Sequence, residues 1–142
     1  MDNMEQRVRA SFGRQAYMKA IGAELTKVAS GSTEIRFRFA QRLTQQDGYL
    51  HAAVTAGALD SACGYAALSV GPERREVLSV EFKVNMLSPA VGQEFVARAQ
   101  VKRAGRKTAV CTADLFSIRE GREKLIATML ATMMYVPGTD TL

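Results

Sequence analysis

The pattern of hydrophobic and polar positions divides the first third of the chain into a helical and two extended segments. Hydrophobic residues at near-helical spacing among Gln and Arg over residues 4–17 predict a short amphipathic surface helix, with Gly22 after its end. Two extended runs then flank a turn at residues 30–32, and hydrophobic and charged positions alternate over residues 34–39 of the second run. We expect these two runs to form a β-hairpin.

Residues 51–70 form a long segment of small, almost uncharged residues. A helix without a charged face must be enclosed by other elements, so we expect it in the interior. The wider stretch of residues 48–72 is long enough to cross a bilayer, which takes roughly 20 residues. Because its apolar residues are mainly alanine and it carries His51 and Asp60, we expect a buried helix of a soluble domain and no membrane contact.

The second half of the chain predicts antiparallel strands. Five hydrophobic residues alternate with polar ones over residues 78–86, which is typical of a strand. A turn at residues 88–92 leads to a second alternating run, residues 104–105 suit a tight hairpin turn, and a third strand follows over residues 108–118.

The last segment, residues 124–136, is ambiguous. Its hydrophobic residues fit a helical stripe, but a wholly apolar run also suits a strand covered on both faces. Periodicity alone favours the helix. The order of elements predicts an α+β domain whose antiparallel sheet wraps one long helix.

Composition narrows the class of protein. With 142 residues, 47% of them hydrophobic, the chain is expected to form a single domain over residues 1–142, with a helical segment at 1–19 and a short tail at 137–142. The formal charge of +5 favours an anionic ligand or a polyanionic partner without selecting either.

Histidine and cysteine are too scarce for a metal site. One histidine, His51, and two distant cysteines, Cys63 and Cys111, cannot supply a multi-histidine cage or a paired-cysteine zinc site, so we expect no metal. The first residues lack the apolar core of a secretory signal. The expected compartment is therefore the cytoplasm, where unpaired thiols are ordinary.

Asp60 is the only carboxylate between residues 48 and 72, and the predicted helix offers it no charged neighbour. Burying an ionised carboxylate without partners costs several kcal/mol. Gly57 and Gly64 fall on its helix face and leave bare backbone, where a ligand can approach closely. Asp60 is thus a candidate catalytic group. Alternatively, it accepts hydrogen bonds from Ser61, a nearby strand or water and only fixes the helix in place.

The entry to this helix is polar, with Gln45, Gln46, Asp47, Gly48 and His51 close together in sequence. Free N–H groups and the positive end of the helix dipole favour a developing negative charge there. N–H donors at a helix start, with a carboxylate two to three turns further along, suit the attack of water on an acyl carbon. The alternative is ordinary capping, in which Asp47 or Gln45 satisfies the first turn.

The stretch LTQQDGYLHAAVTAGALDSACGYAAL, followed by SVEFKVNMLSPAVGQEFVARAQVKRAGRKTAV, resembles the hotdog-fold acyl-CoA thioesterases of the PaaI type. That family has a loop ending in Gly, two variable residues and His followed by Gly-Gly or Ala-Gly, then a helix with a catalytic Asp and later a Ser/Asn-Pro-Ala turn. The resemblance covers residues 20–136. It implies a sheet wrapped around the long helix, a C-terminal strand and active sites at a homodimer interface, with a dimer of dimers as an option.

The resemblance also implies roles for single residues. Asp60 matches the catalytic carboxylate, acting as general base on water or as nucleophile. Ala52 matches the position whose backbone N–H polarises the thioester carbonyl, with Ala52 and Ala53 in place of the glycine pair. Gln45 or Gln46 takes the position where many members have Asn. The residues expected to contact the substrate are Gln46, Asp47, Gly48, His51, Gly57, Ser61, Gly64, Ser88 and Pro89.

A basic cluster flanks the predicted turn at residues 104–105. Arg103, Arg106 and Lys107 would contact the phosphates of coenzyme A through charge-assisted hydrogen bonds, or else form a solvated hairpin tip. Ser88 and Pro89 resemble the family turn that lines the pantetheine tunnel, although Ser-Pro is also a common turn pair.

The sequence thus predicts an acyl-CoA thioesterase for small or medium acyl groups, including aromatic ones, without a metal or redox cofactor. One alternative is a non-catalytic module that binds acyl-CoA or nucleic acid, but the chain has no Trp and no nucleic-acid motif. Another is a hotdog hydratase or dehydratase that uses His51 with Asp60. Against it, His51 falls where thioesterases carry a structural histidine.

Overall fold

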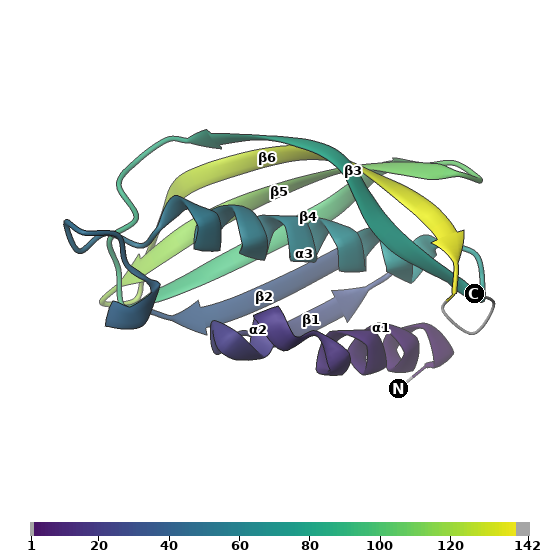
Figure 1. Cartoon of the computed structure of the whole chain (residues 1–142), viewed down its shortest axis with the longest axis horizontal. Coiled ribbons are helices and arrows are strands. Elements are labelled where there is room, and N and C mark those ends of the chain that lie inside the picture. The colour runs from purple at the N-terminus through teal and green to yellow at the C-terminus, as the bar shows by residue number, and fades with distance from the viewer. Residues whose placement is uncertain (1, 139–142) are drawn as a thin grey trace.

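The computed structural model describes residues 2–138 and shows one curved antiparallel sheet folded around a long helix (Figure 1). The sheet has six strands in the order β1-β2-β4-β5-β6-β3. The elements are α1 (Asn3–Arg14), α2 (Ala16–Ala20), β1 (Glu24–Ala29), β2 (Ser32–Arg38), the 3-10 helix η1 (Gln41–Leu43), α3 (Ala52–Val70), β3 (Arg75–Met86), β4 (Glu94–Ala104), β5 (Thr108–Arg119) and β6 (Arg122–Pro137). The fold is the α+β hotdog fold, as the sequence predicted.

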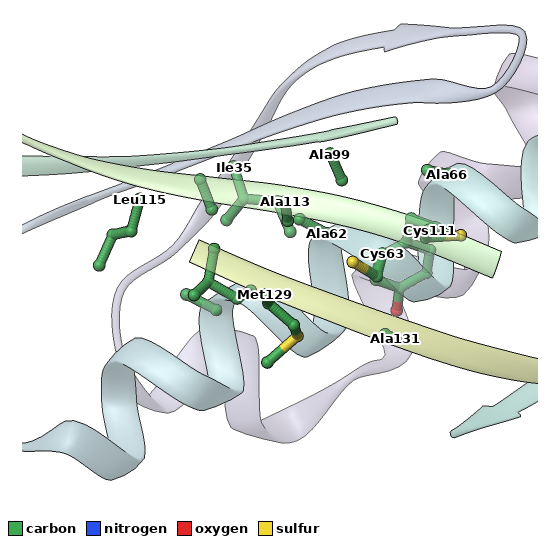
Figure 2. Close-up of a cluster of buried hydrophobic side chains, with 14 of the residues drawn as sticks. Ile35, Ala62, Cys63, Ala66, Ala99, Cys111, Ala113, Leu115, Met129 and Ala131 are labelled. Atoms are coloured by element: carbon green, nitrogen blue, oxygen red, sulfur yellow. The ribbon is translucent and has the colours of Figure 1, made fainter. Parts of the chain in front are cut away.

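The core lies between α3 and the concave face of the sheet. Small residues of α3 such as Ala62 and Ala66 meet alanines and a cysteine of β4, β5 and β6, and all of them are fully buried or nearly so (Figure 2). Small side chains on both surfaces let the helix approach the sheet closely, while Met129 and Leu115 supply larger buried side chains to the same core.

One side of α3 is not covered. Ala53, Ala56, Asp60, Ser61 and Gly64 form a stripe at helical spacing that stays half-buried or exposed. The other residues from Val54 to Ser69, except the half-buried Gly57, are buried by the sheet and α1. The expected full enclosure is therefore wrong for a single chain, because the sheet and α1 cover only part of the helix circumference. We call these five residues the open stripe.

The C-terminal segment is strand β6, which sits between β5 and β3. The helix that periodicity favoured is therefore wrong, and the strand implied by the resemblance is confirmed. Met129 and Met133 face the core, whereas Leu130 and Met134 on the opposite face are about half exposed. Apolar residues on both faces erase the alternation of period two, and this produced the helix-like pattern.

The two ends of the chain differ in detail from the predicted boundaries. The N-terminal helical segment is divided at Gln15, which has extended backbone, into α1 and the short α2. At the other end Pro137 still belongs to β6, and residues 139–142 of the predicted tail lie outside the described residues.

Strand β3 forms one edge of the sheet and is twelve residues long. Leu78, Val80, Phe82 and Met86 expose between 43% and 61% of their surface. A long apolar edge strand leaves unpaired backbone groups that another chain can pair with. The opposite edge, β1, packs against α1.

The two ends of the sheet carry different loops. The loop before α3, the β3–β4 connection and the β5–β6 hairpin gather at the end where α3 begins, and the β4–β5 hairpin lies at the far end (Figure 1). Among the described residues, none of the helices is long and apolar enough to span a membrane.

Candidate active site

Asp60 lies half-buried in the middle of α3 and accepts one hydrogen bond, from Ser79 Oγ to its Oδ1 at 2.5 Å. Within residues 2–138 it has no cationic partner. A carboxylate held by a neutral hydroxyl keeps its negative charge available for a proton or an electrophile. The sequence left two roles open for Asp60, a catalytic group or a carboxylate that only fixes the helix in place. The hydrogen bond from strand β3 that the second role requires is present, but it occupies only one carboxylate oxygen.

Ser79 reaches Asp60 because β3 contains a bulge. The pairing with β6 shifts between Ser79 and Glu81, so Ser79 lies opposite the buried Met133 and faces α3. Leu78, its neighbour, lies opposite the exposed Met134 and faces away. Bulges re-aim a side chain in this way next to functional sites.

Asp60 and Ser79 border a cavity of about 300 Å³ between α3, β3 and α1, which we call the Asp60 cavity. Its α1 side carries a polar network: Gln15 Nε2 donates to Tyr65 Oη at 2.8 Å, and Ser61 Oγ donates to Gln15 Oε1 at 3.1 Å. The cavity therefore combines the Asp60 carboxylate with a wall of fixed polar groups.

The two glycines on the Asp60 face differ in what surrounds them. Gly64 lines the Asp60 cavity, and a Cβ there would meet nothing within 4 Å. Gly57, in contrast, is covered by the ring of Tyr17, whose Cε1 would lie 2.5 Å from an added Cβ. Only Gly64 offers the open backbone that the sequence predicted for both positions.

The start of α3 presents a free N–H. His51 caps the helix, because its Nδ1 accepts a hydrogen bond from Ala53 N at 2.8 Å. Ala52 is exposed, and its N–H has no hydrogen-bond partner among residues 2–138. An exposed N–H at the positive end of a helix is suited to an oxyanion. The cap is His51, so the capping role considered for Asp47 or Gln45 is wrong.

The loop before α3 is a tight turn organised by Gln45. Its Oε1 accepts hydrogen bonds from Asp47 N at 2.5 Å and from Tyr49 N at 3.3 Å, which commits the carbonyl end of the side chain to the loop. Gln46 Nε2 contacts Asp47 Oδ2 at 3.4 Å, and Gly48 adopts φ of +88°, which favours glycine at this position. Only the Gln45 amide NH₂ remains for other partners.

Ala52 and Asp60 are far apart within one chain. Asp60 lies eight positions after Ala52 on the helix, which is about 12 Å along the axis at 1.5 Å per residue. One thioester group cannot reach both groups of the same chain. A site that uses both must therefore take them from two chains.

The remaining predicted residues fall at opposite ends of the sheet. Ser88 and Pro89 lie beside the start of α3, since Leu50 N donates to Ala90 O at 3.3 Å. The basic cluster of Arg103, Arg106 and Lys107 lies at the β4–β5 hairpin, at the far end from Ala52 (Figure 1). Its contact with phosphates stays a prediction.

Several groups at the site carried no clear signal in the sequence. Ser79 read as the polar partner in an alternating strand, and only the bulge turns it toward Asp60. Gln15 and Tyr17 belong to a segment that read as a surface helix. Cys63, three residues after Asp60, is fully buried, and burial raises the pKa of its thiol, so it is not a nucleophile.

Comparison with known proteins identifies the family of this chain. The family described as the thioesterase superfamily matches residues 47–123, which is more than half of the chain and includes α3 and strands β3 to β5. The chain therefore belongs to the thioesterase superfamily, and its enzyme class is thioester hydrolase.

Individual relatives support the same assignment. A thioesterase family protein from Silicibacter pomeroyi of known crystal structure is 46% identical, with a TM-score of 0.94 and coverage of 96% of this chain and 100% of that one. The medium/long-chain acyl-CoA thioesterase YigI of Escherichia coli K12 is 28% identical over 86% of this chain and 85% of its own. The PaaI protein of E. coli shares the fold, with a TM-score of 0.85 at 20% identity, and covers 96% of this chain and 95% of that one.

Proposed function

We propose that this protein hydrolyses the thioester of a small or medium acyl-CoA, with Asp60 as the general base. The observation that carries the proposal is the Asp60 carboxylate, which lines a cavity, has one oxygen held by Ser79 and has no cationic partner among residues 2–138. Such a group can accept a proton from water at the moment of attack.

The proposed reaction needs only the groups described above. Asp60 takes a proton from water as the water oxygen forms a bond to the thioester carbon. The carbonyl oxygen becomes negative and accepts a hydrogen bond from the Ala52 N–H, and the carbon–sulfur bond then breaks. The coenzyme A thiolate leaves and takes the proton from Asp60, which restores the carboxylate, and the acyl group leaves as a carboxylic acid. No metal or redox cofactor takes part.

We further propose that the enzyme is a homodimer with two sites, each combining Asp60 of one chain with Ala52 of the other. Three features support this. The two groups are about 12 Å apart along one helix, the open stripe of α3 lacks cover, and β3 is an exposed apolar edge. Pairing β3 with its symmetry copy would cover both the edge and the stripe. A dimer of dimers is compatible with this arrangement.

The acyl group is proposed to enter the Asp60 cavity beside Gly64. A volume of about 300 Å³ fits a small or medium acyl chain or an aromatic acyl group, and YigI, at 28% identity, is named a medium/long-chain enzyme. We place the activity in the cytoplasm, which agrees with Cys63 and Cys111 being free thiols.

The test is hydrolysis of a panel of acyl-CoAs, measured as release of free thiol, by the wild type and by Asp60→Asn. Loss of the general base is expected to lower kcat by roughly 10²–10⁴-fold. The matched control is Asp114→Asn, because Asp114 also accepts a hydroxyl hydrogen bond, from Thr128 Oγ1 at 2.6 Å, but on the sheet face away from α3. A folded Asp60→Asn enzyme with wild-type turnover would overturn the proposal.

The same panel separates the alternatives. A β-hydroxyacyl-CoA that loses water without releasing thiol would indicate a dehydratase using His51 and Asp60. Tight, salt-dependent binding of single-stranded nucleic acid with no thioester hydrolysis would indicate a binding module. The capping bond from Ala53 N to His51 Nδ1 favours a structural role for this histidine.

A further inference from the structure

A second cavity, of about 430 Å³, lies at the end of the sheet where α3 begins. We call it the cationic cavity. Its walls come from the loop before α3, the β3–β4 connection and the β5–β6 hairpin, and include Tyr49, Pro89, Val91, Arg119, Arg122 and Lys124. The three hairpin cations are separate from the basic cluster at residues 103–107.

The three cations share the sheet face on which α3 lies. Arg119 is directly opposite Arg122 in the β5–β6 register, and Lys124 is opposite Ser117. Alternate residues of a strand point to the same face, and Ser117 is only 3% exposed on the side of the core. The three basic residues therefore extend this face beyond the core, toward the cavity.

Placing these charges together is unfavourable without a counter-charge. Like charges directly opposite on neighbouring strands destabilise the pairing. Arg119, Arg122 and Lys124 have no ion-pair partner among residues 2–138. Glu123 also borders the cavity, but both of its oxygens are bound by Arg98, at 2.8 and 2.6 Å. The cavity thus keeps an uncompensated positive charge.

Another part of the lining is apolar and exposed. Tyr49 and Val91 expose 43% and 42% of their surface, and Pro89 also lines the cavity. A ring and small apolar side chains in one cavity with unpaired cations form a surface that suits a nucleotide, with the base on the apolar residues and the phosphates on the cations.

The cationic cavity also adjoins the proposed oxyanion site. Tyr49 is three residues before Ala52, and Leu50 N donates to Ala90 O at 3.3 Å, which ties the helix entrance to the β3–β4 connection. A thioester at Ala52 would thus have its leaving group close to this connection.

We propose that the cationic cavity binds the 3′-phospho-ADP end of coenzyme A, with Arg119, Arg122 and Lys124 on its phosphates. This inference rests on the proposed function, because it places the nucleotide of the same acyl-CoA whose thioester lies at Ala52, with the pantetheine arm between the two. It assigns the phosphates to the β5–β6 hairpin of the chain that supplies Ala52, in place of the cluster at residues 103–107.

The experiment compares two substrates that carry the same acyl group, an acyl-CoA and the acyl-pantetheine that lacks the nucleotide. In the double variant Arg119→Ala/Arg122→Ala, the KM for acyl-CoA is expected to rise by roughly tenfold or more, the loss typical of charge-assisted hydrogen bonds. In this double variant the kcat for acyl-CoA, and both kcat and KM for acyl-pantetheine, are expected to equal the wild-type values. The matched control Arg14→Ala/Arg38→Ala removes the same charge from two exposed positions away from both hairpins and leaves both KM values unchanged.

Three results would overturn the proposal: an unchanged KM for acyl-CoA, an equal rise for both substrates, or a selective rise for acyl-CoA only in the variant Arg103→Ala/Arg106→Ala, which tests the other basic cluster. Calorimetric titration with coenzyme A separates this failure from failure of the proposed function. If no thioester is hydrolysed but coenzyme A binds the wild type and not Arg119→Ala/Arg122→Ala, the site stands and the reaction is wrong. If coenzyme A does not bind the wild type, the site itself is wrong.

Discussion

Ser79 Oγ donates a 2.5 Å hydrogen bond to Asp60 Oδ1 and joins strand β3 to the middle of α3. This bond fixes the rotamer of the proposed base and leaves Oδ2 for water. The edge strand that we propose as the dimer contact is therefore also the strand that orients the carboxylate.

Replacement of Ser79 should act on turnover more than on binding. In Ser79→Ala the carboxylate loses its fixed position, and we expect kcat to fall about tenfold, as for loss of one hydrogen bond to a charged group, with KM within about twofold. Ser79→Thr keeps the hydroxyl and should restore most of kcat. Thr128→Val, which removes the equivalent hydroxyl from Asp114, serves as the control. Wild-type kcat in Ser79→Ala would exclude a positioning role.

The Ala52 N–H can be removed with little effect on folding. Ala52 is the first residue of α3, where proline is favoured, and the ψ of 137° at His51 suits a residue before proline. Ala52→Pro should therefore have the same free energy of unfolding as the wild type. Its kcat should fall roughly 10²–10³-fold, because the N–H that stabilises the oxyanion is gone. Ala52→Gly retains the N–H and should stay active. Equal activity of the proline and glycine variants would contradict this role.

Mixed dimers test whether a site contains two chains. Asp60→Asn and Ala52→Pro homodimers should both be inactive, because each lacks one group in both sites. A heterodimer has both lesions in one site and none in the other, so it should recover about half of the wild-type activity. Heterodimers can be isolated with two different affinity tags. No recovery in a purified heterodimer would indicate that each site draws on a single chain.

Gly64 should control the size of the acyl group. Since a Cβ at this position meets no neighbour within 4 Å, Gly64→Ala is expected to fold and to gain up to about 1 kcal/mol in unfolding free energy from helix propensity. Gly64→Leu would fill part of the Asp60 cavity. Its kcat/KM should fall at least about tenfold for medium and aromatic acyl-CoAs and stay near wild type for acetyl-CoA. A uniform fall across the panel would place the acyl group elsewhere.

Glu34 should make stability depend on acid pH. Its side chain is 4% exposed, and although burial alone would raise the pKa, hydrogen bonds from Arg36, Arg98 and Thr26 lower it from 4.5 to about 2. A lowered pKa in the folded state stabilises the protein above about pH 4.5, and this contribution is lost as the pH falls toward 2.

Removal of the Glu34 charge should remove this acid dependence. Glu34→Gln is expected to lose about 3 kcal/mol of unfolding free energy at pH 7, since it leaves two arginines facing a neutral amide. The difference from the wild type should narrow between pH 4.5 and 2. Denaturant unfolding at pH 7 and at pH 3 measures both quantities. A constant difference between the two proteins across this range would contradict the argument.

The elements that alternate or lack charge were predictable from sequence, and those that break a local pattern were not. Segment 51–70 is helix α3 because its small residues meet the small residues of the sheet. Segment 78–86 is a strand, as predicted. However, the bulge after Ser79 places Leu78 and Phe82 on opposite faces of the sheet, and no residue type in this segment indicates a bulge. In β6 both faces carry apolar residues, so hydrophobic and polar positions do not alternate and the sequence shows no strand pattern.

The candidate site shows the same division. Asp60 stood out because burying a single ionised carboxylate in an uncharged helix costs free energy, which suggests that the group is kept for a function. Gln45 and His51 were noticed in the polar entry to the helix, and the role of Ala52 came from the resemblance. The structure adds the hydrogen bonds of His51 and Gln45. Ser79, Gln15 and the hairpin cations reach their sites through tertiary contacts, which local sequence does not encode. Local sequence also could not show that Tyr17 covers Gly57.

The N-terminal helices form part of the wall of the proposed acyl site. Ser11 and Gln15 line the Asp60 cavity, and Tyr17 rests on the bare backbone of Gly57. A shortened chain that begins after α2 would keep every strand and α3, and a family comparison would still recognise it. Its Asp60 would nevertheless stand beside an open groove. Changes in the first twenty residues are thus a route by which selection can alter the accepted acyl group without touching the catalytic helix.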